Sequence, residues 1–235
     1  LSPQRSSQAV MEGSNSIVQE ASVSVPLGDL QTRLIAGHLP DWSGYEMQQP
    51  TLNKLITHNL LFDTTLPTAY TGAGLELTRD EWIVKGVLAN MNASRRNTNE
   101  KTPVFAYRAD YAKSEFAGIG FAGVHGKAPN ANAGMDTRID LFEVDGYFNR
   151  GPWTFQGQFG IGRQAQASIT PDPITGELRD ARWAGLSGLV AYKFQPRLEG
   201  VVRLDHIRNR ANGGGLLTYS SADAINGIGP AMAFD

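Results

Sequence analysis

Apolar and polar side chains alternate along much of this chain, in segments of ten residues or more. From Trp153 to Gln164, apolar side chains and glycine occupy the odd-numbered positions as far as Ile161, whereas threonine, glutamine and glycine occupy the even-numbered positions. Successive side chains of a β-strand point to opposite faces, so this pattern predicts a strand with one apolar and one polar face. A strand that crosses an outer membrane needs about 9 to 11 residues. The pattern therefore predicts the wall of a transmembrane β-barrel.

The same alternation predicts ten strands, which pair as five antiparallel hairpins. The expected strand pairs span residues 17–27 with 30–39, 71–78 with 82–92, 103–112 with 116–126, 137–149 with 153–164, and 181–194 with 198–209. The predicted fold class is therefore all-β: an antiparallel transmembrane up-and-down β-barrel with about ten strands in this chain.

Turn lengths predict the orientation of the barrel, because outer-membrane barrels have short periplasmic turns and long external loops. Short turns are expected at residues 28–29, 79–81, 113–115, 149–152 and 195–197, and long loops at 93–102, 127–136, 165–180 and from 210 onward. This alternation holds if residues 40–70 form one long loop, external or folded into the lumen. The strand-like piece Asn59–Leu66 then belongs to that loop. The alternative is that Asn59–Leu66 crosses the wall and is followed by a short external turn.

The predicted topology begins and ends on the external side, whereas the termini of such barrels normally lie in the periplasm. We therefore expect one barrel domain over residues 1–235 that is incomplete at both ends and belongs to a barrel of 12 or more strands, by the even-number rule. Residues 1–15 show neither the basic region nor the apolar run of a signal peptide.

Aromatic side chains on the apolar face gather near the short turns. They are Trp82, Tyr111, Phe148, Trp153, Tyr192 and Phe194. Such a group is typical of a membrane interface, so outer-membrane lipid is an expected partner.

Charged and amide side chains share the opposite, inner face. The predicted pore-lining residues are Glu76, Lys85, Arg108, Asp110, Glu143, Asp145, Gln156, Gln158, Glu199, Arg203 and Asp205. Charges of both signs around a lumen order water and tune the preference for ions and solutes. The simpler interpretation is that they solvate the lumen and pair with their neighbours.

Composition excludes several classes of protein. The chain has no run of 18 apolar residues, which excludes a helical membrane protein, and its mean hydropathy of -0.28 fits either a barrel or a soluble protein. A net charge of -2 with scattered lysines and arginines argues against nucleic acid as a partner. The absence of cysteine excludes disulfides, thiolate metal sites and cysteine nucleophiles.

Signals of catalysis are weak. The four histidines, His38, His58, His125 and His206, lie far apart and outside any metal-binding spacing. Residues 118–123 match the GxGxxG pattern but lack the helix that a dinucleotide site needs. We therefore expect no enzyme, no cofactor and no metal site.

Two stretches resemble a known family: Leu66–Leu77 (LPTAYTGAGLEL), and His206–Pro230 with its NRANGGGLLTY and NGIGP segments. They resemble an uncharacterised porin-like outer-membrane β-barrel family of proteobacteria. The resemblance implies a channel in the outer membrane of a Gram-negative bacterium, and a homo-oligomer such as a trimer. The terminal Asp235 departs from the aromatic residue that ends such barrels.

The function predicted from the sequence is passive diffusion of small hydrophilic solutes or ions. The alternative is a non-conducting structural or receptor barrel that acts through its external loops. A soluble all-β binding protein is a third class.

Overall fold

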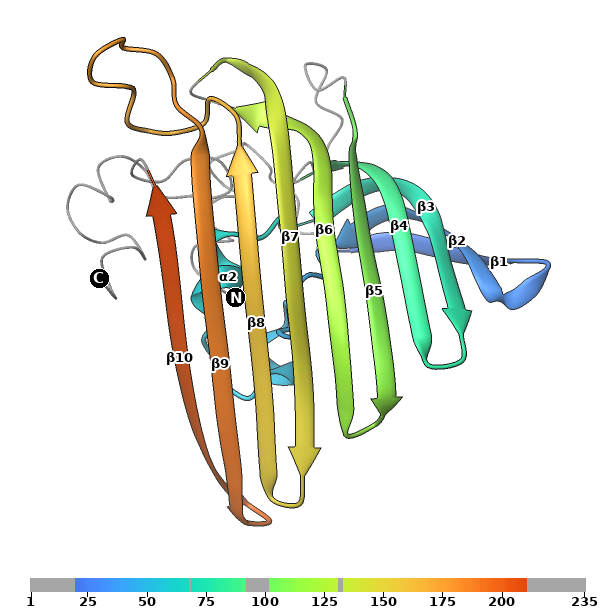
Figure 1. Cartoon of the computed structure of the whole chain (residues 1–235). Coiled ribbons are helices and arrows are strands. Elements are labelled where there is room, and N and C mark those ends of the chain that lie inside the picture. Colours follow the sequence, from blue (N-terminus) through green and yellow to red (C-terminus); the bar gives the residue numbers. More distant parts are fainter. Residues whose placement is uncertain (1–19, 68, 92–101, 131–132, 211–235) are drawn as a thin grey trace.

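The computed structural model describes residues 20–67, 69–91, 102–130 and 133–210. Ten strands form one sheet in chain order, and each neighbouring pair is antiparallel (Figure 1). This confirms the predicted all-β, up-and-down fold class. The strands are β1 (Ala21–Leu27), β2 (Asp29–Pro40), β3 (Ala69–Arg79), β4 (Trp82–Met91), β5 (Val104–Ser114), β6 (Ala117–Asn130), β7 (Met135–Arg150), β8 (Trp153–Gln164), β9 (Ala181–Gln195) and β10 (Leu198–Arg210).

The sheet has two free edges among the described residues. β1 pairs only with β2 and β10 pairs only with β9, so the ten strands curve without closing on themselves (Figure 1).

The segment between β2 and β3 contains a short 3-10 helix, η1 (Pro50–Leu52), and a short α-helix, α2 (Leu60–Thr64). The strand-like reading of Asn59–Leu66 is therefore wrong, because Asn59 caps α2 by accepting a hydrogen bond from the backbone N–H of Phe62. β2 pairs directly with β3, which confirms that this piece does not cross the sheet. No helix in the described residues is long and apolar enough to span a membrane.

The predicted long loop at residues 127–136 is wrong. β6 continues to Asn130 and β7 begins at Met135, because residues 127–130 pair with residues 135–138. Residues 165–180 do form a long connection, between β8 and β9 (Figure 1). The predicted loop at 93–102 lies outside the described residues apart from Thr102, as do the first residues of the first predicted strand and everything after Arg210.

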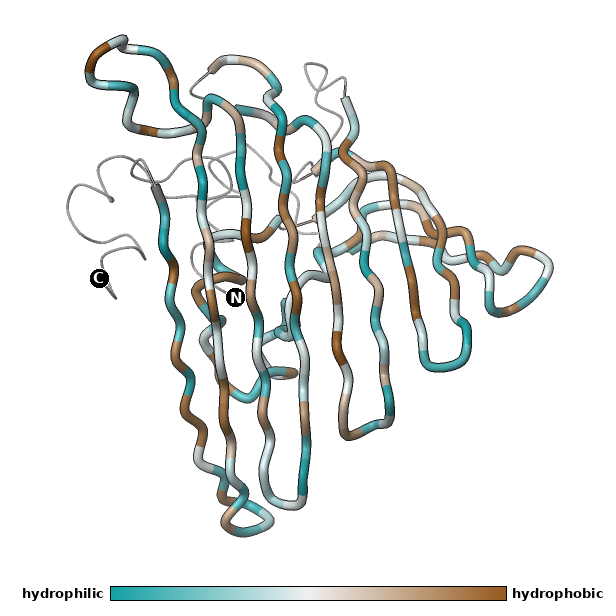
Figure 2. Tube along the Cα trace, in the orientation of Figure 1, coloured by the Kyte–Doolittle hydropathy of each residue, from teal (hydrophilic) through white to brown (hydrophobic). Residues whose placement is uncertain are grey.

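The two faces of the sheet differ in chemistry, and hydrophobic and hydrophilic residues are interspersed along the strands (Figure 2). On the outer face, large apolar side chains remain exposed, with Phe159 at 44% and Leu204 at 75%. On the inner face, the ends of the strands nearer the long loops carry a buried apolar cluster that includes Val124, Ile139 and Leu141. Leu61 and Phe62 of α2 belong to this cluster, so the core lies between the sheet and the segment that connects β2 to β3.

Glycines allow the close approach of β3 to β4. A Cβ atom on Gly74 would lie 2.6 Å from the Cα atom of Val87, and one on Gly72 would lie 2.6 Å from the Cα atom of Ala89. Both obstacles are backbone atoms of the neighbouring strand, which cannot move aside as a side-chain end can.

We predict that Gly74→Ala destabilises the fold by about 1–3 kcal/mol, because the added methyl group must displace β4. The matched control is Gly188→Ala on β9, where a Cβ atom meets nothing within 4 Å. Denaturant unfolding followed by tryptophan fluorescence measures both. Equal midpoints for the two variants would contradict the prediction.

Candidate functional site

The predicted polar residues lie on one face of the sheet, largely in two adjacent cross-strand rows. The first row consists of Arg33, Glu76, Lys85, Arg108, Ala122 and Glu143. The second row consists of Asp110, Gly120, Asp145, Gln158, Ser187 and Asp205. Because antiparallel register sets residues directly opposite one another, the polar positions of separate strands form a belt across the inner face.

Arg108 is the centre of a buried charge cluster. Its guanidinium donates to both carboxylate oxygens of Asp145, at 2.6 and 3.0 Å, and its Nε atom donates to Asp110 at 2.8 Å. Gly120 leaves the space that the guanidinium fills, because a Cβ atom there would overlap it. Removing water from a charge is tolerated only when partners replace it, and here two carboxylates do so.

Glu143 is fully buried and accepts hydrogen bonds from Gln158 Nε2 at 3.1 and 3.2 Å. The Oε1 atom of Gln158 in turn accepts from Asn59 Nδ2 at 3.1 Å. Gln158 therefore joins the sheet to the segment between β2 and β3. We call residues 41–67 of that segment the inward segment.

Arg203 on β10 holds the inward segment through several contacts. It donates to the carbonyl oxygen of Thr57 at 2.6 Å, to that of His58 at 2.7 Å and to Glu46 Oε1 at 3.2 Å. Its Nε atom also donates to Asp205 at 3.0 Å. A single side chain of the sheet thus contacts two separate parts of the inward segment.

Further contacts fix the inward segment against β8, β9 and β10. The hydroxyl groups of Tyr45 and Ser187 lie 2.8 Å apart, and Lys54 Nζ donates to Glu199 at 2.6 Å. Leu61 of α2 is fully buried, and its side chain lies against Gly185. Both polar and apolar contacts therefore hold the inward segment.

The inward segment leaves a cavity of about 920 Å³ between its first part and the inner face. Six of the predicted pore-lining residues line this cavity, namely Glu76, Lys85, Arg108, Asp110, Asp145 and Gln156. Among the other five, Gln158, Glu199, Arg203 and Asp205 contact the inward segment, and Glu143 lies beneath Gln158. The predicted pore-lining residues thus form two groups: six line the cavity, and five contact or support the inward segment.

Carboxylates dominate the charged lining of the cavity. Besides Glu76, Asp110 and Asp145, the lining includes Glu20, Asp41 and Glu46, whereas the cationic side chains among its described residues are Lys85 and Arg108. Arg108 is paired with two of these carboxylates, and Lys85 Nζ lies 5.0 Å from the centre of the Trp42 ring. The cavity therefore carries excess negative charge.

Two side chains of the inward segment have raised pKa values because they are buried. Burial raises the pKa of Tyr45 to about 12 and that of Glu46 to about 7. For Glu46, the hydrogen bond from the backbone N–H of Asn59 and the charge of Arg203 act in the opposite direction, but burial outweighs them. Glu46 therefore changes charge near neutral pH.

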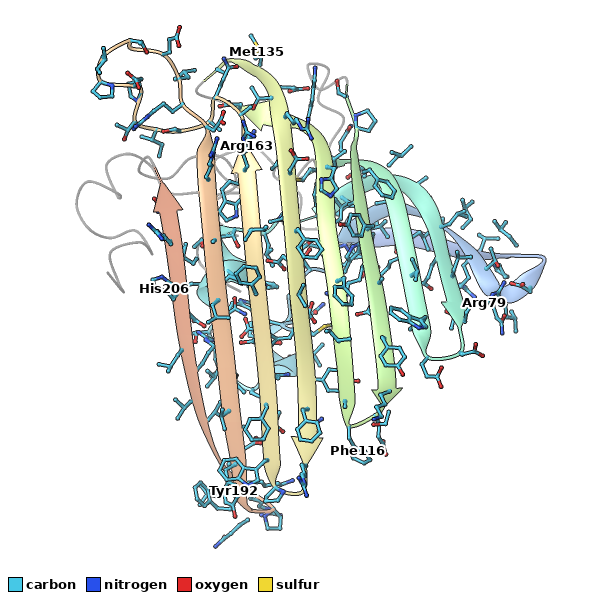
Figure 3. The ribbon with its side chains drawn as sticks, viewed as in Figure 1. Arg79, Phe116, Met135, Arg163, Tyr192 and His206 are labelled. Atoms are coloured by element: carbon cyan, nitrogen blue, oxygen red, sulfur yellow. The ribbon has the colours of Figure 1, made fainter. Side chains whose placement is uncertain are left out.

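The predicted interface aromatics lie on the outer face, where each has an aromatic neighbour. Ring centroids are 5.0 Å apart for Trp82 and Tyr111, 4.5 Å for Trp153 and Tyr192, and 4.8 Å for Tyr192 and Phe194. Phe148 contacts Phe155 at 6.4 Å. Figure 3 shows Tyr192 at the end of the sheet where the short turns lie.

The sequence reasoning missed several residues of this site. Tyr45, Glu46 and Asn59 lie in a segment whose contacts with the sheet no local pattern reveals, since their partners on the strands are more than 90 residues away. Ser187 could have been found, because it occupies an inward position of a strand that the alternation predicts. In the part of the chain that the structure describes, no group of three or more metal-ligating side chains is placed to hold a metal ion.

The fold and this face define an all-β protein built on one up-and-down sheet, with a connecting segment folded onto its polar side. The family model described as protein of unknown function (DUF3138) matches residues 4–128, just over half of the chain, and the chain belongs to this family. No curated protein and no solved structure matches the chain.

We predict that Arg203→Gln detaches the inward segment while the sheet stays folded. Arg203 has a side chain only 11% exposed, and its loss removes hydrogen bonds to the carbonyl oxygens of Thr57 and His58; a hydrogen bond to a charged group contributes about 1.5–3 kcal/mol. Limited proteolysis measures how readily the inward segment is cut. The matched control is Arg208→Gln, on the same strand but exposed. Unchanged cleavage in R203Q would refute the role of Arg203.

We predict that protection of the inward segment weakens as pH rises. The pKa of Glu46 in the folded protein exceeds its ordinary value of 4.5, so its contribution to stability is fully present below pH 4.5 and is lost as pH rises through about 7. Hydrogen exchange of residues 46–60, corrected for its intrinsic pH dependence, measures the effect. The change should vanish in Glu46→Gln; the same pH response in that variant would assign the effect to another group.

Proposed function

We propose that this protein is a channel of the outer membrane of a Gram-negative bacterium, through which small hydrophilic solutes or ions diffuse passively. In this proposal the sheet forms the wall of a barrel, and the inward segment narrows its lumen. The observation that carries the proposal is the exposed apolar outer face opposite a charged inner face.

The outer face of β8 and β9 supports contact with lipid. From Trp153 to Ile161 the outward positions hold only aromatic or aliphatic side chains and glycine, and the pattern repeats from Tyr192 to Leu186. Their large side chains stay exposed, with Phe155 at 40% and Leu186 at 56%. A soluble monomer rarely exposes a continuous apolar surface of this extent, whereas a barrel wall requires one.

Closure of the sheet is part of the proposal. Backbone N–H and C=O groups at a strand edge find no partners in lipid, so a ten-stranded sheet with free edges cannot stand alone in a bilayer. We propose that additional strands join β10 to β1, which gives a barrel of 12 or more strands. Assembly into trimers belongs to the same proposal.

The cavity beside the inward segment supports a polar path through the barrel. Its excess of carboxylates over cationic side chains favours cations, because fixed charges in a narrow space of low dielectric concentrate ions of opposite sign. The proposed channel therefore selects for cations.

A second candidate is a non-conducting barrel that acts as a receptor through its external loops. The docking of the inward segment by Arg203 and the ordered connection between β8 and β9 favour it. Within this β8–β9 connection, the Asp180 carboxylate forms an ion pair with Arg163 at 2.6 Å, and the Asp172 carboxylate accepts hydrogen bonds from two backbone N–H groups.

Planar-bilayer recording of the full-length protein, refolded in detergent, tests the channel, with the reversal potential measured across a salt gradient. We predict steady openings and a reversal potential of the sign that marks cation preference. Glu76→Gln removes one carboxylate from the cavity and should move the reversal potential toward zero. Glu81→Gln, at the exposed turn between β3 and β4, is the matched control and should leave it unchanged.

A folded barrel that inserts but stays electrically silent would contradict the channel and support the receptor. Anion preference would contradict the role assigned to the cavity.

A further inference from the structure

Cationic side chains at neighbouring register positions form a band across the outer face where the apolar surface ends, at the end of the sheet opposite the aromatic residues. Its members are Lys127 on β6, Arg138 on β7, Arg163 on β8, Arg182 on β9 and Arg208 on β10. We call them the basic row. All are exposed, and Figure 3 shows Arg163 at the opposite end of the sheet from Tyr192.

The register places like charges directly opposite one another in this row. Lys127 pairs with Arg138 across β6 and β7, and Arg163 pairs with Arg182 across β8 and β9. Like charges at directly opposite positions repel and destabilise a sheet unless an anion lies between them. Asp180 already bridges Arg163 and Arg182, so a further anion would add to this neutralisation and not supply all of it.

The acidic residues nearby neutralise only part of the basic row. Asp180 accepts from Arg163 at 2.6 Å and from Arg182 at 3.2 Å, and Asp140 accepts from Arg138 at 2.8 Å. Among the side chains that the structure describes, Asp136 is the third carboxylate near the five cationic side chains of the basic row. The side chains of Arg163 and Arg182 remain 56% and 52% exposed, so several of their N–H groups are available to a ligand.

The distance from the aromatic residues to the basic row matches the thickness of the apolar part of a bilayer. Arg163 follows Trp153 by ten residues on the same strand, and both side chains point outward. At about 3.3 Å per residue this is roughly 33 Å along the strand, or about 25 Å along the membrane normal for a tilt of about 40°. If the aromatic residues mark one lipid interface, the basic row lies at the headgroups of the other.

We propose that the basic row binds the phosphate groups of anionic lipid headgroups and so anchors the barrel at the interface opposite its aromatic residues. This inference rests on the proposed function, because it takes the outer face to be in contact with lipid. Arginine suits this ligand, since its planar guanidinium presents paired N–H donors to phosphate oxygens. The outward direction of these side chains, above an apolar wall, favours a lipid over a solute in the lumen.

The test incorporates the refolded full chain into bilayers that mix phosphatidylcholine with phosphatidylglycerol. The lipids that co-purify with the protein in mild detergent are then measured by mass spectrometry. Wild-type protein should retain phosphatidylglycerol in excess over the bulk mixture. Arg163→Gln with Arg182→Gln should reduce that excess by roughly fivefold for each arginine removed. The matched control is Arg150→Gln with Arg197→Gln, which removes the same charge at the short turns.

The outcomes separate the inference from the proposed function. Conductance in pure phosphatidylcholine together with equal lipid retention by wild type and R163Q/R182Q would overturn the lipid-binding role of the basic row and leave the channel proposal standing. An equal loss in the control variant would assign the effect to net charge, and displacement of the lipid by inorganic phosphate would assign the row to a free anion. Both results contradict the inference. Failure of the chain to enter either bilayer would overturn both proposals.

Discussion

Strand alternation is the constraint on which the rest of this structure depends. Side chains of a strand point alternately to two faces, so one register decides at once which residues meet water and which do not. A slip of one residue in β8 would send Gln158 to the outer face and Phe159 into the polar belt. The ladders from β3 to β10 keep every polar row aligned, and this alignment brings Arg108 to Asp145 from strands that are not neighbours. The same register leaves the apolar side chains exposed on the outer face.

Some charged side chains of the polar belt are paired by groups of the inward segment. Charged side chains beside a buried apolar cluster need partners, and Arg203 finds them in Glu46 and in two backbone carbonyl groups of the inward segment. Leu61 and Phe62 complete the docking by filling the apolar part of the inner face. The rest of the belt lines the cavity, where carboxylates outnumber cations. The inner-face side chains therefore have two roles. Those covered by the inward segment hold it in place, and those left uncovered line the cavity and give the proposed ion preference.

Local patterns predicted the strands well and the inward segment poorly. The bounds of β8 agree with the prediction residue for residue, because alternation over twelve residues is a property of the strand itself. α2 was missed because it has five residues, too few to show a helical period, and its stability comes from packing against β9 and β10. The ion pair of Glu46 with Arg203 joins residues 157 positions apart, which no spacing rule reveals. The extension of β6 and β7 beyond their predicted ends likewise depends on pairing between the two strands.

Single-cysteine scanning along β8 tests the central claim most directly, because the chain contains no cysteine of its own. Cysteine replaces each residue from Thr154 to Gly162 in turn in the refolded, bilayer-inserted protein, and two reagents then compete for the thiol. We expect Phe155→Cys, Phe159→Cys and Ile161→Cys to react with a lipid-soluble maleimide and to resist a charged, water-soluble one. Gln156→Cys, at the cavity, should show the opposite preference. Equal reaction with the water-soluble reagent at every position would mean that the outer face meets water, and would contradict the account.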